Sequence, residues 1–303
     1  QNCSMERQFD VIDAHFGYPD GVGAFVAAKR LGIPFFVTLR GFEAEYLERR
    51  LIREQIEHVI RNADGCICVS HFLKEIAIRH GADERKTTVS HNGIDREAFR
   101  PSDPTRQRNE LSLPSDAKII VSVGSLISRK RHHVVLSALA RVLEHNADTL
   151  LLIIGGEAFE SDYPKRLHKQ VRDLAIGDSV RFIGNIDADR VSAYLNAADL
   201  FVLCSSREGC CNAVLEALAC GVPVVTTAVG DNTEFVIDEV NGHIVSVDDV
   251  EATANAIIRA FNGSTWDPTQ ISSDLKVTNW DGVAAQVLRF MSNSLERERI
   301  VPG

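Results

Sequence analysis

Two glutamates eight positions apart, Glu208 and Glu216, stand in the segment best suited to chemistry, SSREGCCNAVLEALACGVPVV. This segment has the pattern of a strand end, a polar turn and a helix. The backbone N–H groups that open the helix, at Asn212, Ala213 and Val214, lack partners within it and carry the positive end of its dipole, which favours a phosphate. Glu216 follows about one turn later, close enough to accept hydrogen bonds from ribose hydroxyls.

A basic turn, GSLISRKRHH, follows another predicted strand and supplies a cation for such a phosphate. Lys130 carries a flexible ammonium that acts as a point charge. A lone cation about 4 Å from a phosphate charge gains roughly 4 kcal/mol at an effective dielectric near 20, before desolvation. The alternative is that Arg129, Lys130 and Arg131 form a solvated basic turn, which fits Arg131 best and Lys130 least.

The first third of the chain offers three further polar residues near predicted strand ends. His15 follows the strand DVIDA, and the turn TLRGFE contains Arg40 and Glu43. The sequence leaves two roles open for Arg40: binding an acidic acceptor or a donor phosphate, or forming a salt bridge with Glu43 or Glu45. His15 is either a structural hydrogen-bonding residue or part of a site at the sheet edge.

The elements that must position these residues alternate between short β-branched runs and longer helical patterns, which predicts βα units and parallel sheets. The pattern breaks between Asn92 and about Ser115, where Pro101, Pro104 and Pro114 punctuate polar sequence. We place the linker there. The predicted division is a partial N-terminal domain with its linker (1–112), a complete doubly wound domain (113–275), and a final helix and tail (276–303).

Composition excludes several classes of protein. A net charge of -9 and a pI near 5.6 argue against nucleic-acid binding, which leaves a basic footprint. No apolar run approaches the roughly 18 residues of a membrane span, and the opening QNCSMERQFD lacks the apolar core of a signal peptide. Seven scattered cysteines fit a reducing compartment, so we expect a cytoplasmic protein. The abrupt start in a strand suggests missing N-terminal sequence.

The pattern from Glu208 to Glu216, followed by EALACGVPVV, resembles the E-x7-E motif of the retaining glycosyltransferases of family 4. The resemblance extends to ADGCICVSHFLKE, KTTVSHNGIDREAFRP, IIVSVGSLISRK and VRFIGNIDADRVSAYLNAADLFVLCSSREG, and so covers most of the chain. It implies the GT-B fold: an α/β protein with two facing Rossmann-like doubly wound domains, the first of them incomplete here.

The resemblance also implies an activity, transfer of a sugar from a UDP- or GDP-sugar to an acceptor hydroxyl of a glycan or lipid-linked molecule. Glu208 would contact the sugar, Glu216 the ribose and Lys130 the diphosphate, with Lys130 and Glu208 as the catalytic pair. No metal or other cofactor is expected, and a lipid-linked acceptor would imply peripheral membrane association. The full donor-binding set is Ser125, Arg129, Lys130, Glu208, Gly209, Cys211, Asn212, Ala213, Val214 and Glu216, and the acceptor-side candidates are His15, Arg40 and Glu43.

The chain departs from the family pattern at two points. Ser125 stands directly after a glycine where the family often has Arg, which leaves Arg129 as a substitute. Arg40 stands where the family frequently has His, so that residue's role is not carried over. Asp187 and Asp189 spell DxD, a metal-binding pattern of a different glycosyltransferase architecture, but they precede a predicted helix, where Asp is expected as a cap.

Two alternatives from other classes remain at this point. A non-catalytic nucleotide-sugar-binding or scaffold fragment is favoured by Ser125, Arg40 and the expected missing N-terminal segment. A nicotinamide oxidoreductase is suggested by the doubly wound pattern alone. It is less favoured, because Val26 stands where the dinucleotide fingerprint that begins at Gly21 and Gly23 needs its third glycine.

Overall fold

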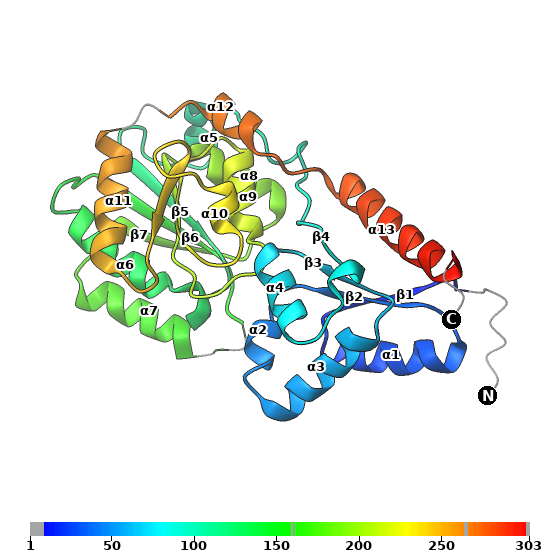
Figure 1. Cartoon of the computed structure of the whole chain (residues 1–303). Helices are drawn as coiled ribbons and strands as arrows, with labels where there is room; N and C mark the ends of the chain where they lie inside the picture. Colours follow the sequence, from blue (N-terminus) through cyan, green and yellow to red (C-terminus); the bar gives the residue numbers. More distant parts are fainter. Residues whose placement is uncertain (1–8, 159, 161, 264–265, 301–303) are drawn as a thin grey trace, which may run out of the picture. The chain divides into compact units, whose positions relative to one another are not determined.

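Strands and helices alternate along the chain as the sequence pattern predicts, and the strands form two separate parallel sheets in the computed structural model (Figure 1). The structure describes residues 9–158, 160, 162–263 and 266–300. The chain divides into two compact units: the first runs up to Gly93 and resumes at Thr278, and the second is Ile94–Val277. The predicted mixed α/β fold with two parallel sheets is therefore confirmed.

The first unit is built on a four-stranded sheet with the order β1-β2-β3-β4. Its strands are β1 (Ile12–His15), β2 (Phe35–Leu39), β3 (Gly65–Cys68) and β4 (Thr87–Val89). Its helices are α1 (Asp20–Leu31), α2 (Glu43–Tyr46), α3 (Arg50–Asn62), α4 (His71–Arg79) and α13 (Trp280–Ile300). Successive side chains of β2 pack on opposite faces, with Phe35 against Phe25 of α1 and Phe36 against Phe290 of α13.

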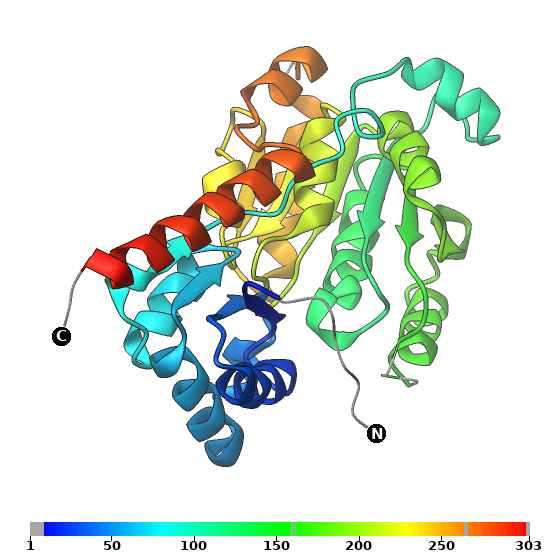
Figure 2. The same cartoon turned by 90° about the vertical axis from the view of Figure 1, so that its right-hand side faces the viewer.

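The C-terminal helix α13 belongs to this first unit and runs along its sheet (Figure 2). The ring of Phe290 meets Phe36 edge to face at 6.2 Å, and Met291 is buried with Phe36 and Ile67. The sequence predicts this helix but treats 276–303 as a separate tail. The structure corrects that division, because the helix buries its apolar side chains on a sheet face formed near the start of the chain.

The second unit is built on a six-stranded parallel sheet with the order β10-β9-β8-β5-β6-β7. Its strands are β5 (Lys118–Val123), β6 (Thr149–Ile154), β7 (Val180–Gly184), β8 (Leu200–Leu203), β9 (Val224–Thr227) and β10 (Gly242–Val245). Its helices are α5 (Pro104–Glu110), α6 (His132–Val142), α7 (Asp162–Asp173), α8 (Ala188–Ala197), α9 (Asn212–Ala219), α10 (Asn232–Phe235), α11 (Val250–Asn262) and α12 (Pro268–Asp274).

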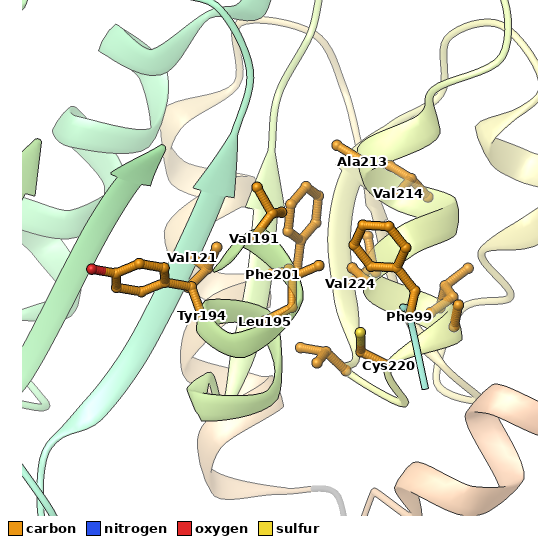
Figure 3. Close-up of a cluster of buried hydrophobic side chains, with 14 of the residues drawn as sticks. Phe99, Val121, Val191, Tyr194, Leu195, Phe201, Ala213, Val214, Cys220 and Val224 are labelled. Carbon is orange, nitrogen blue, oxygen red and sulfur yellow. The ribbon is translucent and has the colours of Figure 1, made fainter. Parts of the chain in front are cut away.

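Both faces of the second sheet are covered, as a parallel sheet requires. Alternate residues of β5 serve different cores: Ile119 and Val121 join one cluster, and Ile120 joins the other. Figure 3 shows part of the first cluster, in which Phe201 of β8 packs with Leu195 of α8. The central strands read as continuous apolar runs because neither of their faces meets water.

The predicted linker also belongs to the second unit. Phe99 is buried in the cluster of Figure 3, and Arg108 of α5 donates hydrogen bonds to the Ala197 carbonyl and to Asp199. The boundary therefore falls between Gly93 and Ile94 rather than after residue 112. A proline-rich polar segment looks like a linker in sequence, but its few apolar and arginine side chains attach it to the domain that follows.

The helices of the described part of the chain include none that is both long and apolar enough to span a membrane.

Candidate active site

The residues predicted to bind a donor lie at the carboxyl edge of the second sheet, at its topological switch point. From β5 the chain continues through β6 and β7 on one side and then returns to β8 on the other side of β5. Ligands of open parallel α/β sheets bind where the strand order reverses in this way. The segments that follow β5 and β8, which contain Lys130 and Glu208, therefore leave the sheet side by side.

Two cations converge on the carboxylate of Glu208. The ammonium of Lys130 lies 2.7 Å from Glu208 Oε1, and Arg129 Nη1 lies 3.1 Å from Glu208 Oε2. Arg129 Nη1 also donates to the carbonyl of Arg207 at 2.9 Å. Only 7% of the Glu208 side chain and 14% of the Lys130 side chain are exposed, so these charges interact with little screening by solvent.

The ionisation of this cluster follows from those contacts. Burial by itself would raise the pKa of the Glu208 carboxyl, but the charges of Lys130 and Arg129 outweigh burial and hold this pKa below its ordinary value. Burial opposes the charge of Lys130 in the same way, yet the pKa of its ammonium is raised, and near neutral pH the charge of Glu208 and its hydrogen bond favour the charged form. The Glu208 and Lys130 side chains are therefore both charged at neutral pH.

Backbone contacts fix the two segments that carry these charges. Ser206 N–H donates to the Arg129 carbonyl at 2.9 Å, which ties the turn after β8 to the turn after β5. Gly230 lies directly behind the Glu208 turn with φ +55°, and a Cβ atom there would lie 2.5 Å from the carbonyl oxygen of Gly209. A glycine is therefore required at position 230, both for its left-handed backbone and for this close approach.

Helix α9 begins beside the cluster without a side-chain cap. Cys211 occupies the N-cap position with extended backbone, and its carbonyl accepts hydrogen bonds from the amides of Val214 and Leu215. Within the described residues, no carbonyl or side chain accepts from the Ala213 amide. Burial raises the pKa of the Cys211 thiol to about 11, so this residue is a neutral thiol at the helix start.

Glu216 lies in α9, partly buried. Among the described residues, none donates a hydrogen bond to its carboxylate. Burial raises the pKa of Glu216 to about 7, and the charge of Lys130 only partly opposes this shift. The carboxylate can therefore still accept two hydrogen bonds from a ligand.

Three residues of the predicted donor set contact one another, and the others lie in the turns after β5 and β8 and in α9. Arg129, Lys130 and Glu208 form one cluster, and Gly209 and Cys211 continue from it into α9. Ser125 lies exposed just beyond β5. Its neighbour Gly124 is close to the Lys130 stem, since a Cβ at position 124 would lie 3.2 Å from Lys130 Cδ. Arg131 is ion-paired with Asp248 at 2.9 Å rather than solvated.

The acceptor-side candidates gather at the carboxyl edge of the first sheet. Arg40 Nη1 lies 3.3 Å from His15 Nδ1, and Arg40 Nη2 donates to Asn92 Oδ1 at 3.2 Å. From the sequence, Asn92 is identified only as the start of the predicted linker, and its contact with Arg40 is not predicted. The available signal was position, because Asn92 follows the strand TTV at the sheet edge to which His15 and Arg40 also belong.

Glu43 is buried at 1% exposure and accepts hydrogen bonds from the backbone amides of Gly17, Arg40 and Gly41. The alternative of a salt bridge between Arg40 and Glu43 or Glu45 is therefore wrong: Glu43 takes the Arg40 backbone amide, and the guanidinium turns to His15 and Asn92. Three backbone amides therefore hold the Glu43 carboxyl group in this turn.

Asp187 and Asp189 are both exposed at the start of α8. Asp187 occupies the predicted N-cap position with extended backbone, although its side chain makes no capping hydrogen bond.

The chain therefore has a two-domain architecture of Rossmann-like α/β units, and the second unit gathers cations at the switch point of its sheet. The family model of the group 1 glycosyl transferases matches residues 103–271, and that of glycosyltransferase family 4 matches residues 3–98. The chain belongs to the group 1 glycosyltransferases, and its fold is GT-B. The predicted family is confirmed, and the oxidoreductase alternative is set aside.

Individual relatives agree with this assignment. The chain is 30% identical to a D-inositol 3-phosphate glycosyltransferase of Stackebrandtia nassauensis, over 97% of this chain and 70% of that protein. It is 28% identical to D-inositol 3-phosphate glycosyltransferase 2 of Catenulispora acidiphila, over 82% of this chain and 62% of that protein. The chain thus spans under two thirds of the latter relative.

A solved structure shares the fold. The Anabaena protein HepE, crystallised in complex with UDP, superimposes with a TM-score of 0.84 at 22% identity, covering 94% of this chain and 79% of that one.

Proposed function

We propose that this chain acts as a retaining glycosyltransferase, which transfers a sugar from a UDP- or GDP-sugar to an acceptor hydroxyl. The observation that carries the proposal is the convergence of Lys130 and Arg129 on Glu208 at the switch point of the second sheet. Two cations that reach the two oxygens of one carboxylate can also reach the oxygens of a diphosphate. The UDP in the HepE crystal structure supports a uridine donor.

Five residues would hold the donor. Lys130 and Arg129 would bind the diphosphate, and the unpartnered amide of Ala213 would add a hydrogen bond from the start of α9. Glu216 would accept hydrogen bonds from the ribose, and Glu208 would contact the sugar.

The proposed reaction is a front-face displacement. The bond between the anomeric carbon and the diphosphate oxygen breaks, while the acceptor oxygen forms a bond to the same face of that carbon. The acceptor proton moves to an oxygen of the departing diphosphate. Lys130 and Arg129 would stabilise the charge that develops on this leaving group, and stabilisation specific to the transition state is what accelerates a reaction.

The two cations would supply the charge that a metal ion provides elsewhere, so we propose that transfer is independent of divalent metal.

The D-inositol 3-phosphate in the names of the two relatives makes this molecule the first acceptor probe. A glycan or lipid-linked acceptor is the wider class. We propose a cytoplasmic enzyme, with peripheral membrane association where the acceptor is lipid-linked.

A thermal-shift panel of UDP-, GDP- and ADP-sugars tests the donor site, because a ligand that binds the native state raises its apparent stability. We expect a UDP- or GDP-sugar to raise the melting temperature, and transfer of a labelled sugar to persist in EDTA. Stabilisation by no nucleotide sugar would overturn the donor site. Stabilisation with no transfer to any acceptor in the panel would instead favour the non-catalytic scaffold.

A further inference from the structure

Glu43 has a buried carboxyl group to which the donor site gives no role. Its carboxylate accepts from Gly17 N–H at 3.0 Å, Gly41 N–H at 2.8 Å and Arg40 N–H at 3.2 Å. Burial of a carboxylate is costly unless hydrogen bonds replace its water. Here those bonds come entirely from backbone amides, so the position of this side chain and the shape of the backbone around it determine each other.

The three amides belong to two different turns. Gly17 lies just beyond the end of β1, whereas Arg40 and Gly41 lie just beyond the end of β2, and the two strands are neighbours in the sheet. Each turn contains left-handed backbone, with φ at 75° for Phe16 and 129° for Gly41. The Glu43 carboxylate therefore joins the turns and holds backbone conformations that L-residues rarely adopt.

The joined turns carry His15 and Arg40 to hydrogen-bonding distance. Arg40 has only donors, so His15 Nδ1, 3.3 Å away, must be the acceptor and the imidazole proton must lie on Nε2. His15 Nε2 lies 3.5 Å from Asp13 Oδ2, which can accept a hydrogen bond from the Nε2–H group. The contacts with Arg40 and Asp13 thus favour the tautomer with its proton on Nε2, in an imidazole whose side chain is 54% exposed.

The charges of the cluster indicate what it can bind. Arg40 supplies one cation, while Asp13 and Glu43 supply two carboxylates, and the described residues place no carboxylate in an ion pair with Arg40. Asp13 also accepts from the hydroxyl of Thr38 at 3.0 Å. A cluster with more acids than cations suits the hydroxyl groups of a sugar or polyol better than a second anion.

We propose that Glu43 is a positioning residue for acceptor binding: it touches no substrate, and it sets the spacing of His15 and Arg40, which bind acceptor hydroxyls. This inference rests on the proposed glycosyltransferase function and names the acceptor class at the first sheet. Misplacement of a binding group by about 1 Å can cost on the order of 100-fold in rate. Loss of the hydrogen bonds to Glu43 should therefore lower kcat/KM for the acceptor and leave donor affinity unchanged.

The test compares Glu43→Gln with Glu45→Gln, which makes the same charge change two residues away in α2. Steady-state transfer is measured with D-inositol 3-phosphate and with uncharged myo-inositol, and UDP affinity is measured separately. For Glu43→Gln we expect kcat/KM for the acceptor to fall about 10- to 100-fold. UDP affinity should stay within twofold of the wild-type value. Arg40→Ala should likewise lower kcat/KM for the acceptor and leave UDP affinity unchanged. Glu45→Gln should match the wild type.

A second readout needs no transfer. Long-range ¹H–¹⁵N spectra of the histidine rings at pH 8 report which ring nitrogen carries the proton. His15 should show protonated Nε2 in the wild type and in Glu45→Gln, and a mixture of tautomers in Glu43→Gln and Arg40→Ala.

The outcomes separate this inference from the proposed function. An unchanged His15 tautomer in Glu43→Gln, or UDP affinity falling in parallel with acceptor kinetics, would overturn the positioning role. If the wild type transfers sugar to neither probe, the acceptor role falls with the proposed function for these acceptors, and the tautomer readout alone decides whether Glu43 positions His15.

Discussion

The Lys130 ammonium and the Glu208 carboxylate lie 2.7 Å apart at the switch point of the second sheet, and Arg129 completes the bridge from the other carboxylate oxygen. Glu208, which we propose contacts the sugar, is thus ion-paired with both Lys130 and Arg129, which we propose bind the diphosphate. A diphosphate must share these cations with Glu208 or displace it from them.

This competition predicts opposite effects of Glu208→Gln on binding and on turnover. Without the carboxylate charge, UDP should bind more tightly, by about 10-fold if one close charge contact is relieved. Sugar transfer should fall, because the contact to the sugar is lost. Calorimetric titration with UDP measures the first effect, and Asp248→Asn, which removes the carboxylate partner of neighbouring Arg131, is the control. Weaker UDP binding in Glu208→Gln would refute the competition.

Lys130→Ala should nearly abolish turnover. Removing one donor that stabilises developing charge typically lowers kcat by about 10²–10³-fold. The assay is sugar transfer at saturating donor, so that weaker donor binding does not mask the loss in kcat. Retention of at least half the wild-type kcat would exclude this role for Lys130.

Glu216 predicts a pH dependence of nucleotide binding. Its pKa of about 7 means that the carboxyl is largely protonated at pH 6 and ionised at pH 8. The ionised form accepts ribose hydrogen bonds more strongly, so UDP affinity should rise between pH 6 and pH 8. Glu216→Gln should bind UDP more weakly at pH 8 and lose this part of the pH profile. If Glu216→Gln shows the same pH profile of UDP affinity as the wild type, another group is responsible for the titration.

The raised pKa of Glu216 also predicts that the stability of the folded protein depends on pH. The folded pKa lies above the ordinary value of 4.5, so the native state binds more protons than the unfolded chain between these values. The stabilisation is fully present below about pH 4.5 and is lost as pH rises through about 7. Glu216→Gln should therefore gain stability relative to the wild type at pH 8, on the order of 1–3 kcal/mol, since one pKa unit is worth about 1.4 kcal/mol. Denaturant unfolding at pH 5 and pH 8 measures the difference.

Phe290 tests the assignment of the last helix to the first unit. Phe290→Ala removes the ring that packs on Phe36 and on Gly65, and should destabilise the first unit by about 2–4 kcal/mol. Leu288→Ala on the same helix should change stability by less than about 0.5 kcal/mol, because Leu288 is 62% exposed. Hydrogen exchange at β2 and β3 localises the effect. Equal protection of these strands in both variants would contradict the packing.

The sequence by itself determined the fold class and the family, and it selected the residues that we propose bind the donor. Alternating strand and helix patterns give parallel α/β sheets, and the spacing from Glu208 to Glu216 places one acid in a turn and the other in the following helix. These are local properties, set by a few adjacent residues and their periodicity.

Only the tertiary structure decided which distant residues meet. The bridge from Glu208 to both Arg129 and Lys130 joins positions nearly 80 residues apart and depends on β8 returning beside β5. The hydrogen bonds from three amides to Glu43 depend on two neighbouring turns. The packing of α13 on β2 brings together residues about 250 positions apart in the sequence, Phe36 and Phe290. Such contacts depend on strand order and on the burial of specific faces, which no local pattern encodes.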